Sequence, residues 1–214
     1  MASGRPIQRE PEPATAEARC VSMEDLELIN KIRTGQTEAY GDLVRKYEDR
    51  VSNTCWRICG HLEDARDVTQ EAFLKAYEGL SEFRRDSGFY TWIFRIAVNL
   101  ALTKRRDAAR RRTTSLEEAA GSLGAQARDL VLRASPQNDP GSDEVTENHG
   151  RLLSAIHDLE PDYRSVVVLR DIEGMDYETI AGILDIPTGT VKSRLHRARV
   201  ILSTALQPAK ARRK

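Results

Sequence analysis

The strongest constraint on the fold is a pair of apolar-patterned segments, residues 176–184 and 188–206, joined by a tight turn. The turn, residues 185–187, ends in a proline, which cannot continue a preceding helix because it lacks an amide hydrogen and clashes with the turn before it. Asp176 and Thr188 are residue types favoured at helix N-caps. We therefore expect two helices packed across a short turn, as in a helix-turn-helix.

The apolar pattern also predicts which side of the second helix is exposed. The contact between the two helices is expected to involve six residues: Ile180, Ala181, Leu184, Ile186, Val191 and Leu195. The outward face is then formed by Lys192, Ser193, His196 and Arg197. Thr190 lies in the first turn, and Arg194 and Arg199 flank the outward face. Such a face offers cations to DNA phosphates and polar groups to base edges, and a solvated basic face is the alternative.

The charge pattern supports a polyanionic partner, although the formal net charge of the chain is zero. Residues 104–112 carry six basic residues against one aspartate, and residues 192–214 carry eight basic residues and no acidic one. Residues 113–147 between them hold seven acidic residues and two arginines. Basic surfaces that are separated in this way can bind nucleic acid even when the average charge is zero.

Helical periodicity runs through most of the remaining chain. Four helices are expected between residues 24 and 112, and Ser22 with Asp25 resembles a capping box at the start of the first. Two more helices are expected at 148–159 and 162–173. The prediction is an all-α fold, with two small helical domains joined by a mostly irregular linker.

Segments without periodicity lie between and beside these helices. Residues 113–147 contain Gly, Ser, Pro, Asn and Asp and are predicted to be the linker, which could extend over roughly 115 to 125 Å. Residues 1–22 are expected to be a disordered tail, and residues 208–214 a basic C-terminal tail. The first twenty residues lack the apolar core of a secretory signal, and no run approaches a membrane span. A cytoplasmic protein without direct membrane insertion is expected.

The cysteines are Cys20, Cys55 and Cys59, an odd number that predicts reduced thiols rather than a disulfide framework. Cys55, Cys59 and His61 have a Cys-x3-Cys-x-His spacing that could bind zinc or sense oxidants. However, Cys55 and Cys59 are one turn apart on an apolar face, and free cysteine behaves as a small buried hydrophobe. Core packing is the favoured interpretation, and no metal or cofactor is expected.

Two long stretches resemble a known family. YETIAGILDIPTGTVKSRLHRAR resembles the promoter-recognition helix-turn-helix (region 4) of extracytoplasmic-function sigma factors. EDARDVTQEAFLKAYEGLSEFRRDSGFYTWIFRIAVN resembles their N-terminal domain (region 2), particularly in sigma-E-like members. The resemblance covers about residues 23–107 and 148–206. It implies region 2 at 23–112, region 4 at 148–207, and an alternative sigma factor that directs core RNA polymerase to promoters in a stress or envelope response.

The resemblance implies a polymerase-binding helix at residues 64–78. In the family this helix binds the clamp coiled coil of the largest polymerase subunit, and region 4 binds the flap. The expected binding residues are Asp64, Asp67, Gln70, Glu71 and Phe73, the last as either core or interface. From the carboxylates alone, a solvated helix face is the simpler interpretation, and the motif match favours the interface.

The resemblance also implies that region 2 opens the −10 element by holding a flipped base of the non-template strand. Stacking and edge hydrogen bonds offset the few kcal/mol that extrusion costs. Asn99 occupies the position whose family counterpart contacts that base, whereas the aromatic rings also fit an ordinary core stripe. The residues expected at this surface are Phe83, Arg84, Arg85, Tyr90, Trp92, Asn99, Lys104 and Arg105, the last two holding duplex phosphates.

Groupings that indicate catalysis are missing from the sequence. It contains no phosphate-binding glycine loop and no credible Ser-His-Asp set, so no enzymatic activity is expected. Members of the family are commonly bound by an anti-sigma factor that clamps both domains. By analogy, an anti-sigma factor is expected here, either soluble or membrane-anchored. Two other functions stay open: a stand-alone transcription regulator that binds duplex DNA without polymerase, and a protein-binding adaptor that titrates a membrane-linked regulator.

Overall fold

In a computed structural model of the 214-residue chain, residues 22–84, 87–115 and 143–207 are described. Within these ranges every regular element is helical and there is no strand. The helices form an N-terminal domain and a C-terminal domain, so the predicted all-α fold with two helical domains and a linker is confirmed. Most of the predicted linker and nearly all of the two predicted tails lie outside the described residues.

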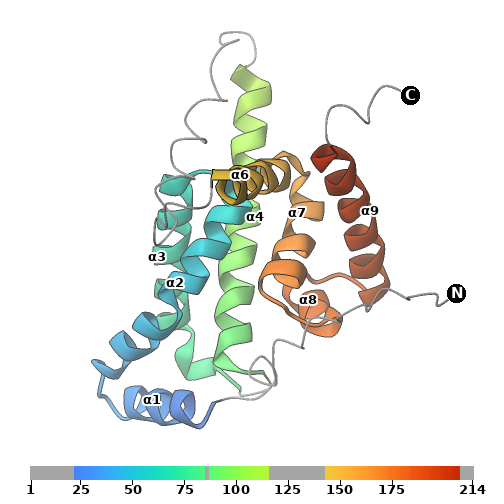
Figure 1. Cartoon of the computed structure of the whole chain (residues 1–214). Helices are drawn as coiled ribbons and strands as arrows, with labels where there is room; N and C mark the ends of the chain where they lie inside the picture. The colour runs from blue at the N-terminus through green and yellow to red at the C-terminus, as the bar shows by residue number, and fades with distance from the viewer. Residues whose placement is uncertain (1–21, 85–86, 116–142, 208–214) are drawn as a thin grey trace, which may run out of the picture.

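The N-terminal domain contains α1 (Met23–Arg33), α2 (Ala39–Cys59), α3 (Leu62–Glu78), the short 3-10 turn η2 (Leu80–Glu82) and α4 (Phe89–Ser115). In Figure 1, α4 runs through the middle of the molecule, with α2 and α3 beside it. These three helices pack on one another because each has an apolar stripe at three- and four-residue spacing. Their buried side chains include Leu43, Val51, Ile58, Val68, Ala72, Phe89, Ile93 and Val98.

The C-terminal domain contains α6 (Asp143–Asp158), α7 (Pro161–Val167), the π-helical turn η3 (Val168–Ile172), α8 (Tyr177–Leu184) and α9 (Thr188–Leu206). A proline fits the first turn of α7 because its missing amide hydrogen would have no helical acceptor there. α8 and α9 are the two helices of the predicted helix-turn-helix, at nearly the predicted bounds. The π-helical turn that continues α7 was not predicted.

The turn between α8 and α9 is defined by its caps. Asp176 caps α8 as predicted, because its carboxylate accepts a hydrogen bond from the amide of Thr179 at 2.8 Å. The prediction for Thr188 is wrong: Pro187 occupies the N-cap position of α9, and no side chain caps this helix. Asp185 adopts a left-handed backbone with φ of 54°, a conformation that aspartate tolerates better than most residues. This residue reverses the chain between the two helices.

The start of α1 also differs from the prediction. Ser22 stands at the N-cap position of α1 but makes no side-chain capping bond, so the predicted capping box is wrong. Asp25 is buried instead, and its carboxylate accepts hydrogen bonds from Lys46 Nζ at 2.8 Å and Tyr47 Oη at 2.6 Å. The carboxylate therefore ties α1 to α2 rather than capping α1.

Two helices are longer than the sequence predicted. α4 continues to Ser115, and α6 begins at Asp143 rather than at residue 148. Both helices therefore extend into residues 113–147, the segment predicted to be an irregular linker. Helical periodicity is weak at both places, because few apolar residues lie near these helix ends.

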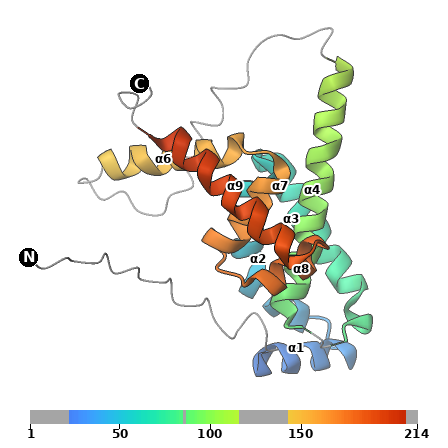
Figure 2. The ribbon, with the colours of Figure 1, turned by 90° about the vertical axis from the view of Figure 1, so that its right-hand side faces the viewer.

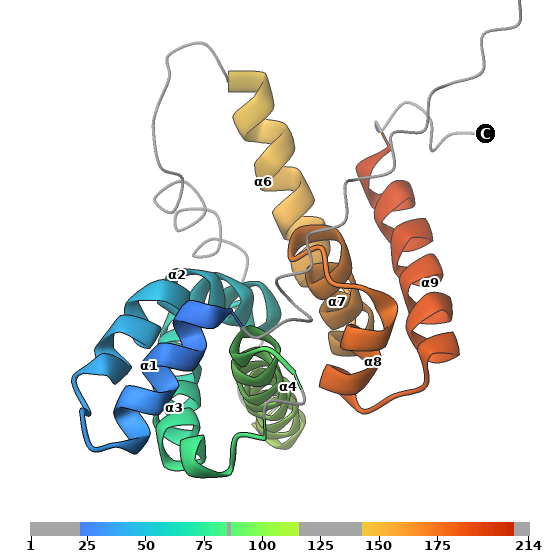
Figure 3. The same ribbon diagram turned by 90° about the horizontal axis from the view of Figure 1, so that it is seen from below.

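The linker is long enough for the domains to sit apart, but here they pack directly against each other. Figure 3 shows α1 to α4 on one side and α6 to α9 on the other. α8 packs on α4, and α2 contacts α6, α7 and η3, so that buried apolar side chains form one cluster across both domains. α9 packs on α6, α7 and α8 and lies on the side away from α1 to α3 (Figures 1 and 2).

Candidate nucleic-acid interface

The helix-turn-helix presents the face that the sequence predicted. Ile180, Val191 and Leu195 are fully or almost fully buried between α8 and neighbouring helices, and the other three predicted contact residues are partly buried. This packing turns one polar set of α9 toward solvent, namely Lys192, Ser193, His196 and Arg197, all of which are exposed. We call these four residues the recognition face.

Two contacts hold the first turns of α9. Ser193 Oγ donates a hydrogen bond to the carbonyl oxygen of Thr190 at 3.0 Å, and Thr190 is half-buried. Lys192 Nζ lies 5.6 Å from the ring centroid of Tyr177, at the start of α8. A cation over a ring face is held weakly at such exposed positions, so Lys192 stays available to an anionic partner.

The two arginines that flank the recognition face are engaged in ion pairs within the domain. Arg194 Nη2 lies 2.6 Å from a carboxylate oxygen of Asp162 in α7, and Arg199 Nε lies 3.2 Å from Asp171 in η3. The hydrogen bond to Asp171 raises the pKa of Arg199 above its usual value. Because exposed ion pairs are worth about 1 kcal/mol or less, a DNA phosphate could replace either carboxylate.

The aromatic residues, for which the sequence left a stacking surface and a core stripe open, pack against other aromatic rings. Phe83 and Tyr90 are buried, and Trp92 is partly buried. The ring centroids of Phe83 and Trp92 are 5.1 Å apart, and those of Tyr90 and Phe94 are 4.3 Å apart. In this arrangement Phe83 and Tyr90 are core residues and are not exposed as a stacking surface.

The polar residues predicted for the same surface are placed differently. Asn99 on α4 and Arg84 are exposed, and Arg85 lies outside the described residues. Lys104 Nζ lies 3.1 Å from Asp67 and 3.6 Å from Asp64 on α3, and its pKa is raised chiefly by the hydrogen bond to Asp67. On α4, the Asn99 amide is therefore exposed to solvent, whereas the Lys104 ammonium forms an ion pair with Asp67 of α3.

Arg105 reaches the end of α2 rather than open solvent. Its Nη1 donates a hydrogen bond to the carbonyl oxygen of Cys59 at 2.8 Å, and the residue is half-buried. A cation at this place is favourable because the last carbonyls of a helix carry partial negative charge.

The α3 face is only partly the one predicted. Gln70 and Glu71 are exposed, and Glu71 forms an i,i+4 ion pair with Lys75 at 2.9 Å. Asp64 and Asp67 face Lys104, as described above. Phe73 is 7% exposed and packs in the hydrophobic core, which favours the core alternative of the two left by the sequence.

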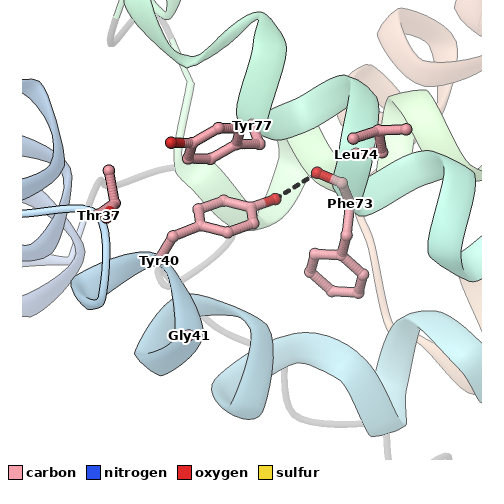
Figure 4. Close-up of a pocket in the computed structure, with 6 residues that line it drawn as sticks. All are labelled: Thr37, Tyr40, Gly41, Phe73, Leu74 and Tyr77. Atoms are coloured by element: carbon pink, nitrogen blue, oxygen red, sulfur yellow. Dashed lines mark hydrogen bonds between the residues drawn. The ribbon is translucent and has the colours of Figure 1, made fainter.

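An apolar groove lies where the end of α3 meets the start of α2 (Figure 4). Leu74 is 58% exposed and Tyr77 is 41% exposed, and the rings of Tyr40 and Tyr77 meet edge to face at 4.9 Å. The lining residues are Thr37, Tyr40, Gly41, Phe73, Leu74 and Tyr77. The groove was not predicted from the sequence, although Leu74 stands one turn after Gln70 and outside the buried stripe.

A buried polar contact between the domains centres on Glu173, which nothing in the sequence indicated. Glu173 follows η3 and is 7% exposed. Its Oε1 accepts a hydrogen bond from Thr54 Oγ1 at 2.7 Å, and its Oε2 accepts bonds from Arg50 Nε and Tyr90 Oη, each at 3.3 Å. The guanidinium of Arg50 lies 4.6 Å from the ring centroid of Tyr90. One carboxylate of the C-terminal domain thus engages α2 and α4 together.

Arg164 of α7 is the second polar link between the domains and is fully buried. Its Nη1 donates to the carbonyl oxygen of Ile58 at the end of α2 at 2.7 Å. Its remaining nitrogens donate to carbonyl oxygens at the end of α6, namely those of Ile156, His157 and Leu159. Burial lowers the pKa of Arg164 to about 9. An arginine beside the apolar run SVVVL is the sequence signal that could have indicated a buried guanidinium.

The cysteines of α2 pack in the core, as predicted. Cys55 and Cys59 are buried, and burial raises the pKa of each thiol to about 12. Such thiols hold their protons at neutral pH and are poor nucleophiles. Among the described residues no group of three or more His, Cys, Asp or Glu side chains could hold a metal ion, and no helix has the length and apolarity to cross a membrane.

Two family models match the chain, one in each domain. The model described as Sigma-70 region 2 matches residues 43–111, and that described as Sigma-70, region 4 matches residues 149–202. The first match covers α3 and most of α2 and α4, and the second covers α8 and most of α9.

Curated relatives match over most of the chain. The ECF RNA polymerase sigma-E factor of Haemophilus influenzae is 36% identical over 188 residues, covering 86% of this chain and 96% of the relative. The RNA polymerase sigma-H factor of Pseudomonas aeruginosa is 37% identical over 188 residues, covering 86% of this chain and 95% of that factor. The ECF RNA polymerase sigma-E factor of Escherichia coli K12 is 36% identical over 185 residues, covering 86% of this chain and 95% of that factor.

Solved structures share the fold. The sigma factor RpoE of Bartonella quintana, in complex with the anti-sigma factor NepR, matches with a TM-score of 0.61 and 23% identity, covering 78% of this chain and 96% of that one. CnrH, in complex with the cytosolic domain of CnrY, matches with a TM-score of 0.58 and 27% identity, covering 86% and 97%.

Proposed function

The chain belongs to the extracytoplasmic-function sigma factors of the sigma-70 family, and from this premise we propose how its described surfaces serve promoter-specific initiation. It acts as an alternative sigma factor, which binds core RNA polymerase and directs it to its promoters. The observation that carries the residue-level proposal is the recognition face of α9, whose four polar side chains are exposed while the opposite side of the helix is buried.

Region 4 reads the −35 duplex through this face. α9 enters the major groove, and Lys192, Ser193, His196 and Arg197 reach the base edges. Thr190, Arg194 and Arg199 contact the phosphates beside them, with the two arginines exchanging their aspartate partners for DNA. Breaking the two ion pairs costs little free energy because both are partly exposed to solvent.

Region 2 opens and reads the −10 element. The exposed amide of Asn99 reads the flipped base, and the exposed Arg84 together with Arg85 and Lys104 holds the strand. Arg105 has the same role once it leaves the Cys59 carbonyl. Tyr90 is covered by Glu173 of region 4, so full access to its part of α4 requires the two regions to separate. Phe83 supports the surface from the core, and the partly buried Trp92 packs beside it.

The polymerase-binding surface lies on α3. Gln70 and Glu71 meet the clamp coiled coil of the largest subunit, with Asp64 and Asp67 at its edge, and the exposed Leu74 of the groove extends the surface with apolar area. Phe73 supports it from the core. Region 4 contacts the polymerase flap, which sets its distance from region 2 on the promoter.

An anti-sigma factor controls access to these surfaces. Support comes from CnrH, a structural relative at 27% identity that was solved with the cytosolic domain of CnrY. We propose that the protein acts in the cytoplasm, where its polymerase and promoters are, and that it catalyses no reaction by itself.

The test is run-off transcription with sigma-free core polymerase on pooled genomic promoter fragments, with and without the protein, followed by mapping of start sites. New starts that share two upstream elements at a fixed spacing are expected, and they give the −35 and −10 sequences directly. Sequence-specific binding of the isolated protein to duplex DNA, without new starts, would instead indicate a stand-alone regulator. Failure to bind core polymerase would overturn the proposal.

A further inference from the structure

Glu173 occupies a site on region 2 that is suited to an oxyanion in general. Three donors from two helices meet at its carboxylate: the Thr54 hydroxyl at 2.7 Å, the Arg50 Nε at 3.3 Å and the Tyr90 hydroxyl at 3.3 Å. We propose that these donors form a phosphate-binding site, which Glu173 fills while the domains are docked and a backbone phosphate of single-stranded promoter DNA fills once they separate. The proposal rests on the proposed function of region 2.

The chemistry of the donors favours a phosphate. Arginine, threonine and tyrosine side chains are all common phosphate contacts in protein–DNA complexes, and a carboxylate offers the same pair of acceptor oxygens. Arg50 and Thr54 are four residues apart on α2 and therefore share a face of that helix, to which the first turn of α4 adds Tyr90. The guanidinium of Arg50 lies 4.6 Å from the centroid of the Tyr90 ring, and this contact orients the Nε–H donor of Arg50.

A further cation adds positive potential at the same place. Arg57, one turn after Thr54, interacts electrostatically with Glu173, and its partly buried guanidinium has an Nε without a hydrogen-bond partner among the described residues. Burial lowers the pKa of Arg57, and the charge of Glu173 opposes that shift. When Glu173 leaves, the positive charge of Arg50 and Arg57 is no longer compensated by that carboxylate, so an incoming anion is favoured.

The position of the site favours DNA over other anions. Tyr90 lies on α4, the helix that carries the exposed Asn99 and continues into the basic stretch 104–112. Nine residues, or two and a half turns, separate Tyr90 from Asn99, so the two lie on opposite sides of α4, about 14 Å apart along its axis. A single strand that contacts Asn99 therefore reaches the site by passing around the start of α4, where a further phosphate contact lengthens the bound strand. The site is closed in the docked state, because Thr54 and Tyr90 are buried there.

The test separates the docking role of Arg50 from DNA binding by first removing Glu173. Full-length E173A, E173A/R50Q and E173A/T54V are each assembled with core polymerase and titrated with a fluorescent single-stranded oligonucleotide carrying the −10 element found by start-site mapping. The matched control is E173A/R45Q, because Arg45 is an exposed arginine of the same helix that pairs with Asp42. Affinity for core polymerase and helical content are measured for every variant.

In the E173A background, R50Q is expected to weaken oligonucleotide binding by about three- to tenfold and to reduce the slope of log affinity against log salt by about 0.7. T54V should weaken binding less and leave the slope unchanged, since it removes no charge. If both double variants bind like E173A/R45Q with the same salt slope, Arg50 and Thr54 serve docking alone and the proposal is wrong. If E173A itself does not distinguish the −10 strand from a scrambled strand, the proposed function of region 2 fails as well, which is a separate and recognisable result.

Discussion

The Glu173 carboxylate accepts a hydrogen bond from the Thr54 hydroxyl at 2.7 Å and thereby joins region 4 to region 2. Replacing Glu173 by alanine leaves the buried Thr54 donor without an acceptor, at a cost of about 1 to 3 kcal/mol to the docked state. We expect E173A to populate separated domains, with a larger radius of gyration by small-angle X-ray scattering and unchanged helical content. E48Q, at an exposed carboxylate of α2, is the control. An unchanged radius would mean that apolar contacts alone hold the domains.

Arg164 is expected to be the most sensitive polar residue in the molecule, because it satisfies carbonyl oxygens at the ends of α2 and α6 while fully buried. R164K keeps the charge but has fewer donors in a different geometry, so at least one carbonyl oxygen loses its partner. We expect urea unfolding to show a loss of roughly 2 to 4 kcal/mol. R151K, at an exposed arginine of α6, should change the free energy of unfolding very little. A similarly small change in R164K would contradict this view of the interface.

His157 should make stability depend on pH. Burial and the nearby Arg164 lower its pKa from 6.5 to about 4, and its Nε2 is buried without a hydrogen-bond partner among the described residues. Between these pH values the unfolded chain binds a proton that the folded chain does not. The stabilisation is therefore complete above pH 6.5 and is lost as the pH falls toward 4, by at most about 3 kcal/mol.

Urea unfolding at several pH values between 7 and 4.5 measures this contribution of His157. In H157N the free energy of unfolding should fall less with decreasing pH than in the wild type, whereas H196N, at an exposed position, should retain the wild-type slope. Equal slopes in H157N and the wild type would assign the acid sensitivity to other groups.

The helix-turn-helix could be predicted because its determinants are local. Asp176 caps α8 through an amide three residues away, and Pro187 sets the start of α9, so that a short stretch of sequence contains the whole signal. The exposed recognition face follows from helical periodicity, which places Val191 and Leu195 inward.

The domain docking could not be predicted in the same way. Glu173 and Thr54 are 119 residues apart, and no spacing or composition links them. Phe83 and Tyr90 show the same limit, because an aromatic residue beside arginines fits either a stacking surface or a core, and only the packing of α4 against its neighbours decides. The residues that sequence analysis missed are therefore those whose partners are distant in the chain.

Arg33 at the end of α1 is one such residue, and it should affect promoter opening. Its Nη2 donates to the carbonyl oxygens of Leu80, Ser81 and Phe83 at 3.0, 3.2 and 2.8 Å, which fixes the turn that leads to Arg84. We expect R33A to slow open-complex formation on duplex promoters, as measured by fluorescence of a base analogue in the −10 element.

A premelted template tests this explanation of R33A, because it supplies the open strand directly and should restore initiation to near the wild-type rate. K31A, at an exposed residue of the same helix, is the control. If R33A is equally slow on premelted DNA, the turn acts in a later step. If it is not slow on duplex DNA, the three hydrogen bonds have no role in opening.

Substitutions of Arg197 and Arg199 should separate base reading from phosphate binding by α9. Arg197 is exposed in the middle of the face, whereas Arg199 lies at its edge and pairs with Asp171. If Arg197 bonds a base edge, R197A should weaken −35 binding by about 1 to 3 kcal/mol and lose discrimination at one base pair. R199A should weaken all sequences alike and reduce the salt dependence. Both are measured by competition of holoenzyme binding among single-base variants of the promoter, and an unchanged preference in R197A would remove Arg197 from the base-reading residues.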